Sequence, residues 1–238
     1  MGYRFKAPGG YSFLEPPGFY TVKLTVGGRE FTQQLEVKKD PHSEGSEADI
    51  HAQVALMRKI VEDANRLADM INQIEWIRKQ LRDLKDVLAG TNDARTIVEA
   101  ADELERKLIG VEEHLLRMKS TGRGQDYLRW PPQLAEKLGY LHDQVDWDFA
   151  PTIQQAEVHR MLREQVANHR SQLDEVLGRE LVALNALLRE RNLPHIIQPG
   201  EHAARSGAQE SPQPLSHKLS QNVWGFTGVY ERVDVLSP

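Results

Sequence analysis

The chain of 238 residues is long enough for one large domain or two small ones, and its 39% hydrophobic and 27% charged residues allow a packed core beneath a well-solvated surface. A formal net charge of −5 gives no electrostatic reason to expect binding to nucleic acid or to an anionic membrane. The absence of cysteine excludes disulfides, thiolate nucleophiles and cysteine-ligated zinc, and no run approaches the roughly 18 apolar residues of a membrane span.

The most regular local pattern is a β-hairpin at residues 18–38. In the stretch PPGFYTVKLTVGGREFTQQLEVKKDP, apolar and polar residues alternate on both sides of Gly27 and Gly28, and two glycines can adopt the positive φ angles of a tight hairpin turn. This turn predicts three facing pairs, which are Tyr20–Leu35, Val22–Gln33 and Leu24–Phe31. The apolar residues of both strands therefore share one face, and their polar residues share the other.

Residues 1–41 are too few for a complete β-sandwich. A lone two-stranded hairpin is marginally stable in water, and an immunoglobulin-like sandwich uses about seven strands over about 100 residues. Upstream of the hairpin there is room for one more short strand, at Tyr3 to Phe5. We therefore interpret residues 1–41 as the truncated end of such a sandwich.

Residues 46–193 carry the three- and four-residue spacing of apolar side chains that is typical of amphipathic helices. The spacing and its interruptions predict four helices, at about 47–89, 94–119, 132–147 and 152–192. Ser46 with Asp49, and Thr152 with Gln155, have the spacing of capping boxes at the starts of the first and last helices.

The helix lengths predict how the helices pack. The first and the last helix each span roughly 60 Å at about 1.5 Å per residue, and the two middle helices together match one such rod. The predicted fold class is therefore mainly α, with the hairpin preceding an elongated antiparallel helical bundle of three rods, of which the middle one is broken. A compact bundle of four helices is the alternative, and either would pack at shallow crossing angles.

The composition changes after the last helix. Residues 194–222 are rich in Gly, Ser, Pro, Gln and His and predict a flexible linker. Residues 223–238 regain Val, Trp, Phe and Tyr, and they predict a short β-like tail that could turn at Thr227–Gly228.

Five of the nine histidines lie on predicted helices, namely His51, His114, His142, His159 and His169. None has a glutamate three residues before it and no two are four residues apart, so the helical spacings that build di-iron and zinc sites are missing. His159 and His169 lie ten residues apart and would point about 80° away from each other on a helix. We expect ordinary surface or boundary histidines and no metal site.

The densest acidic cluster is formed by Asp143, Asp146 and Asp148 in HDQVDWDF. These side chains could act as a carboxylate pair or as calcium ligands, but no glycine-rich calcium loop accompanies them, and carboxylates are common at the helix ends that they flank. No nucleophile-elbow, phosphate-loop or dinucleotide motif is present either. We therefore predict no catalytic, cofactor-binding or metal-binding residue and no cofactor for this chain.

Four aromatic residues could line a carbohydrate-stacking surface, namely Trp76, Tyr127, Trp130 and Trp147. Aromatic residues at such positions more often close the ends of helical bundles and pin loops, so a packing role is the favoured interpretation.

The order of these segments resembles the C-terminal end of large bacterial sortilin-like proteins, which carry BNR repeats in WD40/YVTN/BNR-like propellers and are often labelled glycosyl hydrolases. The hairpin stretch at 16–41 resembles the PGTYTVRLTVDGK-YTQPLTVKxDPR stretch of that family, and LNALLRERNLPHI at 184–196 is similar to its LNALLREAGLP. The GRGQD loop at 122–126 and the APT at 150–152 are also similar, whereas His42 stands where the family has arginine.

The resemblance implies a non-catalytic accessory region that follows the propellers, with the propeller and sandwich domains of its own parent protein as partners. It also implies a periplasmic or extracellular location, although the start MGYRFKAPGG has no apolar segment of a signal peptide. Two alternatives stay open. The regular seam of residues 97–118 favours a self-associating coiled coil and thus a homo-oligomer. The chain could instead belong to a glycoside hydrolase whose catalytic propeller lies elsewhere, or be a hydrolase itself that uses Asp143, Asp146 or Asp148.

Overall fold

The computed structural model describes residues 13–91, 94–119, 126–198 and 232–236. Contacts divide the chain into two compact units, which we call the helical unit and the sheet unit. The described residues of the helical unit are 13, 55–91, 94–119, 126–147 and 151–198. The described residues of the sheet unit are 14–54, 148–150 and 232–236.

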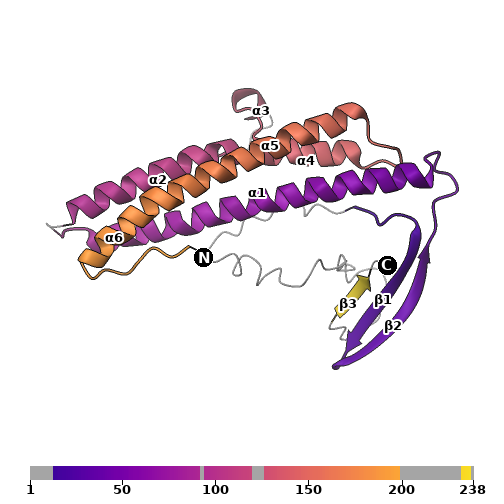
Figure 1. Cartoon of the computed structure of the whole chain (residues 1–238), viewed down its shortest axis with the longest axis horizontal. Coiled ribbons are helices and arrows are strands. Elements are labelled where there is room, and N and C mark those ends of the chain that lie inside the picture. The colour runs from indigo at the N-terminus through magenta and orange to yellow at the C-terminus, as the bar shows by residue number, and fades with distance from the viewer. Residues whose placement is uncertain (1–12, 92–93, 120–125, 199–231, 237–238) are drawn as a thin grey trace. The chain divides into compact units, whose positions relative to one another are not determined.

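The described strands of the sheet unit are β1 (Gly18–Val26), β2 (Arg29–Val37) and β3 (Arg232–Leu236). They lie in the order β2-β1-β3, and both pairings are antiparallel (Figure 1). Gly27 and Gly28 form the turn with φ angles of 55° and 74°. The register joins Tyr20 to Leu35, Val22 to Gln33 and Leu24 to Phe31, so the predicted hairpin is confirmed.

The third strand lies in the segment for which the sequence predicts a β-like tail. It pairs with β1 from Thr21 opposite Leu236 to Thr25 opposite Arg232. The expected strand at Tyr3–Phe5 lies outside the described residues, as does the expected turn at Thr227–Gly228.

The apolar face of the hairpin is covered at one end. Tyr20 is 5% exposed, and its hydroxyl donates a hydrogen bond to the carbonyl oxygen of Pro16 at 2.5 Å. Phe31 and Leu35, on the same face of β2, are 56% and 47% exposed. β2 is an edge strand of the described sheet. These two side chains therefore present an apolar surface that the described residues of the unit cover only in part.

The long helices are α1 (Glu47–Leu88), α2 (Arg95–Leu115), α4 (Leu134–Val145), α5 (Ile153–Val176) and α6 (Val182–Glu190). The short α3 (Asp126–Arg129) lies between α2 and α4, and the π-helical turn η1 (Leu177–Leu181) joins α5 to α6. In the helical unit, α2 and α4 follow one another beside the continuous rod of α5, η1 and α6, and α1 runs along both (Figure 1). The predicted fold class, a mainly helical bundle with an N-terminal hairpin, is confirmed.

Side-chain caps fix where three helices begin. Ser46 and Asp49 form the predicted reciprocal bonds at the start of α1, with Asp49 N 3.1 Å from Ser46 Oγ. Thr152 and Gln155 do the same for α5. A third cap, which was not predicted, is formed by Gln133 and Glu136 at the start of α4, directly after Pro131–Pro132.

The interior of the bundle is filled by one seam of aliphatic side chains. Those that are fully buried include Met57, Ile60, Leu67, Ile74, Ile77, Leu81, Leu104, Leu108, Leu115, Leu134 and Leu138. Leu173, Leu181 and Leu188 continue the seam on the third rod. Since removal of apolar surface from water is the main stabilising contribution in folding, this seam holds the three rods together along their length.

The π-helical turn corrects a drift in the buried stripe of the third rod. Leu188 follows Leu162 by 26 residues, which at about 100° per residue is about 80° more than seven turns. The buried leucines step by four residues twice, from Leu173 to Leu177 and on to Leu181, and these eight residues of α-helix would turn about 80° more than two full turns. A π turn accommodates the additional residue, so the leucines on both sides of η1 stay on the buried face.

No helix in the described part of the chain combines the length and the apolar character that crossing a membrane requires.

Candidate functional site

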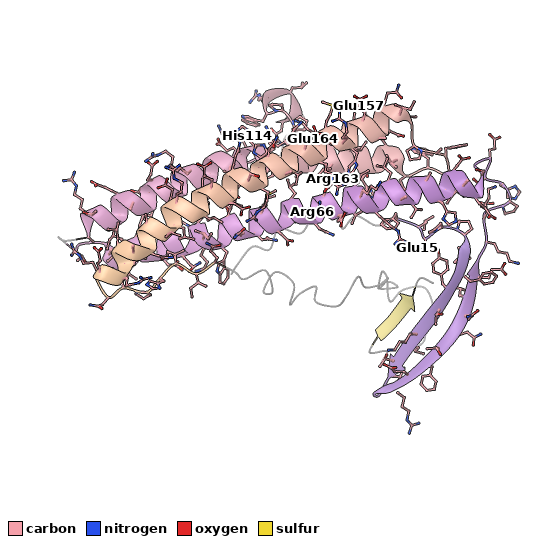
Figure 2. The ribbon with its side chains drawn as sticks, viewed as in Figure 1. Glu15, Arg66, His114, Glu157, Arg163 and Glu164 are labelled. Carbon is pink, nitrogen blue, oxygen red and sulfur yellow. The ribbon has the colours of Figure 1, made fainter. Side chains whose placement is uncertain are left out.

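Asp63 on α1 is a charged group inside the helical unit and is 1% exposed. Its Oδ2 lies 2.9 Å from Nε2 of His159 on α5, and its Oδ1 accepts a hydrogen bond from Arg66 at 3.0 Å. Arg163, one turn after His159, places its Nε 3.8 Å from the same carboxylate. Figure 2 labels Arg66 and Arg163 on the facing helices. We call these four residues the Asp63 cluster.

The Asp63 cluster is an orienting arrangement rather than a reactive one. A carboxylate bound to an imidazole nitrogen is the pair that orients the base in serine hydrolases, but here both carboxylate oxygens also face guanidinium groups. His159 is 5% exposed, so its ring lies inside the bundle. The expectation that the helical histidines lie at the surface or its boundary is therefore wrong for His159, whose burial is compensated by Asp63.

A second charged cluster joins α1 to α2. Arg78 Nη1 lies 2.5 Å from Glu75 Oε1 and 2.5 Å from Glu112 Oε2, and its Nε lies 3.8 Å from Glu105 Oε1. The Glu112 side chain is 2% exposed. Burial raises the pKa of Glu112 to about 7, with a further contribution from Glu75, although Arg78 acts in the opposite direction. We call Glu75, Arg78, Glu105 and Glu112 the Glu112 cluster.

The same helix pair carries more charges beyond this cluster. Lys85 Nζ on α1 lies 2.8 Å from Asp102 Oδ1 and 2.7 Å from Glu105 Oε2 on α2, and these bonds raise the pKa of Lys85. Arg82 places its Nη2 3.9 Å from Glu75 Oε2. The charges therefore form a ladder along α1 and α2, with the Glu112 cluster as its most buried part.

Two other histidines form a contact that no sequence pattern predicts. The rings of His114 on α2 and His169 on α5 are stacked, with centroids 5.2 Å apart and planes inclined by 14°. Nδ1 of His169 lies 2.9 Å from Oε1 of Gln172. Among the described residues, no group of three His, Cys, Asp or Glu side chains gathers as a metal site would require.

None of the remaining predicted candidates is a member of either charged cluster. His51 is exposed, and His142 is buried with its Nδ1 3.3 Å from Asp143 Oδ1, so the surface expectation is wrong for His142 as well. Asp143, Asp146 and Asp148 are all exposed.

The predicted aromatic residues are partly open to solvent. Trp76 is 50% and Trp147 is 67% exposed, Trp130 is half-buried, and the side chain of Tyr127 lies outside the described residues. Trp76 lines a shallow, open groove of about 290 Å³ together with Lys79, Gln80, Asp83 and Ile197.

One wall of that groove is a segment of extended chain held by two side-chain amides. Asn185 on α6 donates to the carbonyl oxygen of Ile196 at 3.0 Å and accepts from its N–H at 2.9 Å. Gln80 on α1 bonds both backbone groups of Ile197 in the same way, at 2.8 Å each. We call this arrangement the amide clamp. It fixes the chain that follows α6 across two helices.

Comparison with known proteins identifies no relative of this chain. No protein-family model, curated protein or solved structure matches this chain.

Proposed function

We propose that this chain is a non-catalytic structural region of an exported bacterial protein of the sortilin-like, BNR-propeller type. In this proposal the helical bundle packs against or spaces a β-propeller of the same protein, in the periplasm or outside the cell. The observation that carries the proposal is the aliphatic seam, which includes Met57 on α1 and Leu188 on α6 and fills the space between the three rods. A bundle with a filled interior is a rigid element that can hold neighbouring domains at a fixed distance.

The charged groups of the bundle support the same proposal. The two carboxylate oxygens of Asp63 and the Glu112 carboxylate face arginine or histidine groups of their own unit, and these bonds join α1 to α5 and α1 to α2. Buried polar groups that are bonded across helices fix the register of a bundle. The half-exposed Phe31 and Leu35 of the sheet unit offer an apolar face that another sheet could cover.

The resemblance of the hairpin and of residues 184–196 is what specifies the propeller and the exported location. Sequencing of the genomic DNA around the coding region tests this part of the proposal. An in-frame propeller upstream supports it. A separate promoter and ribosome-binding site, with no propeller gene in the same operon, would contradict it.

The self-associating coiled coil is a second candidate, and the structure bears on its interface. Ile97, Leu104, Leu108 and Leu115 of the regular seam are each at most 4% exposed inside the chain's own bundle. Self-association through this seam would therefore require the bundle to open. Sedimentation of the full chain from about 1 to 100 µM tests the candidate, since a monomer over that range contradicts it.

The hydrolase alternative has a direct biochemical test as well. It requires turnover of glycoside or ester substrates that is lost in Asp143→Asn, Asp146→Asn or Asp148→Asn. Equal turnover by all three variants and the unchanged protein would exclude these carboxylates as the catalytic groups.

A further inference from the structure

The ladder of charges between α1 and α2 has more negative than positive groups. Among the described residues, its cations are Arg78, Arg82 and Lys85, and its carboxylates are Glu75, Asp102, Glu105 and Glu112. Exposed carboxylates such as Asp102 tolerate an excess negative charge because water solvates them. Glu112, with a side chain that is 2% exposed, lacks that solvation.

The geometry around Glu112 concentrates this excess on two carboxyl groups. Arg78 offers the same nitrogen, Nη1, to Glu75 and to Glu112, each at 2.5 Å. The same guanidinium group also faces Glu105, whose Oε1 lies 3.8 Å from Nε, so one cation serves three carboxyl groups. Glu112 is therefore buried without a cation of its own, and burial next to other carboxylates favours the protonated form of a carboxyl group.

We propose that the buried Glu112 holds a proton at the α1–α2 contact beside Glu75, and that loss of this proton weakens the contact, so that the bundle contains a pH-responsive joint. In the protonated state Glu112 is neutral and accepts from Arg78, whose charge then compensates that of Glu75. When the proton leaves, two like charges face each other across one guanidinium group.

The charged groups around Glu112 lie on α1 and α2. Arg78 and Glu75 of α1 act on Glu112 directly, Arg82 lies 3.9 Å from Glu75 on its other side, and Glu105 of α2 lies 3.8 Å from Arg78 Nε. On the α5 side of α2, His169 stacks on His114 and, in η1, Glu180 bonds Lys107. These two contacts flank Glu112 along α2 and involve neither Glu112 nor Glu75.

The direction of the pH effect follows from proton binding in the folded and unfolded chains. Burial raises the pKa of Glu112 from 4.5 to about 7, so between these values the folded chain binds the proton more tightly than the unfolded chain does. The stabilisation is therefore complete below pH 4.5 and is lost as the pH rises through about 7. In the middle of this interval, the unfolding equilibrium constant rises by up to about tenfold per pH unit because of this pair.

The test compares the full chain with Glu112→Gln and with Glu99→Gln as the matched control. Glutamine has the shape of protonated glutamate, so its amide oxygen can accept from Arg78, and the side chain has no proton to lose. Glu99 lies on the same helix, has a 62% exposed side chain and pairs with Arg95. Urea unfolding of the three proteins is measured at intervals from pH 5 to pH 8.5.

The ratio of the unfolding constants of the unchanged protein and Glu112→Gln is expected to rise by up to about tenfold per pH unit below pH 7 and to level off above it. The corresponding ratio for Glu99→Gln is expected to stay constant. A constant ratio for Glu112→Gln would overturn the proposal.

Infrared spectroscopy gives a second readout that does not depend on the folding of any variant. At pH 6, the unchanged protein should show the carbonyl absorption of a protonated carboxylic acid, and this band should disappear by pH 8.5. Absence of the band at pH 6 would overturn the proposal even if Glu112→Gln failed to fold.

Discussion

His159 Nε2 and Asp63 Oδ2 lie 2.9 Å apart, although 96 positions separate the two residues in the chain. Each of them sits on a helix whose other buried positions are almost entirely aliphatic. A buried polar pair of this kind contributes little net stability when it is complete, but it leaves a costly unpaired group when one partner is removed. The pair therefore disfavours every packing of α5 on α1 in which the two side chains do not meet.

The first prediction tests the role of this pair. Asp63→Ala leaves His159 buried and Arg66 and Arg163 without their shared carboxylate, so we expect the free energy of unfolding to fall by about 3 kcal/mol. Glu62→Ala is the control, because Glu62 precedes Asp63 but has a 58% exposed side chain and should cost less than about 0.5 kcal/mol. Urea unfolding followed by circular dichroism measures both, and equal losses would show that the pair has no special role.

The second prediction concerns the additional residue in the third rod. Deletion of Gly178 should convert η1 into α-helix while the leucines on both sides stay on the buried face. Deletion of Ala167, in the regular part of α5, should instead rotate Leu173 and Leu177 by about 100°, even if η1 becomes α-helix and returns the later leucines to the buried face. We expect a melting temperature close to that of the unchanged chain for the first variant and a large decrease for the second. Similar melting temperatures for the two deletions would contradict this account of the π turn.

Local regularities of the sequence predicted much of the fold. Gly27 and Gly28 set the turn, and the turn sets the register of every facing pair in the hairpin. The capping boxes at Ser46 and Thr152 mark where α1 and α5 begin, because the bonds that form them lie within one turn of helix. The π turn could not be read in this way, because two successive four-residue steps, such as those from Leu173 to Leu181, also occur in a regular α-helix.

The polar contacts between helices could not be predicted in the same way. Asp63 and His159, or Arg78 and Glu112, meet because two helices pack at one particular rotation and offset. A period of 3.6 residues predicts which face is buried, but it does not predict which residues of two such faces lie opposite each other. Histidine is a residue type that is often exposed, so exposure was expected for His142 and His159, and the structure shows both to be buried.

The third prediction concerns a close approach of two backbones in the sheet unit. Gly45 is buried, and a Cβ atom at this position would lie 1.5 Å from the carbonyl oxygen of Asp148. Gly45→Ala must therefore displace backbone, and we expect it to lower the free energy of unfolding by about 2 kcal/mol. Gly110→Ala is the control, because a Cβ at Gly110 in α2 meets nothing within 4 Å, and alanine should raise the stability by about 0.5–1 kcal/mol. A neutral Gly45→Ala would show that the contact is dispensable.

The last prediction concerns the amide clamp. Asn185→Ala removes the acceptor of the Ile196 N–H and the donor to its carbonyl oxygen, so we expect the Ile196 amide proton to lose its protection from hydrogen exchange. Asn185→Asp keeps the acceptor but loses the donor, and it should retain part of that protection. The global free energy of unfolding should change by no more than about 1–2 kcal/mol, since the seam remains intact.

Gln172→Ala serves as the control for the clamp, because Gln172 bonds His169 and neither residue belongs to the clamp. Hydrogen exchange followed by mass spectrometry of peptides that cover residues 193–198 measures all three variants. Exchange in this segment should be fastest in Asn185→Ala, intermediate in Asn185→Asp and unchanged in Gln172→Ala. If exchange in Asn185→Ala were as slow as in the unchanged chain, the burial of Ile196, which is 5% exposed, would be sufficient to protect its amide proton without the bonds to Asn185.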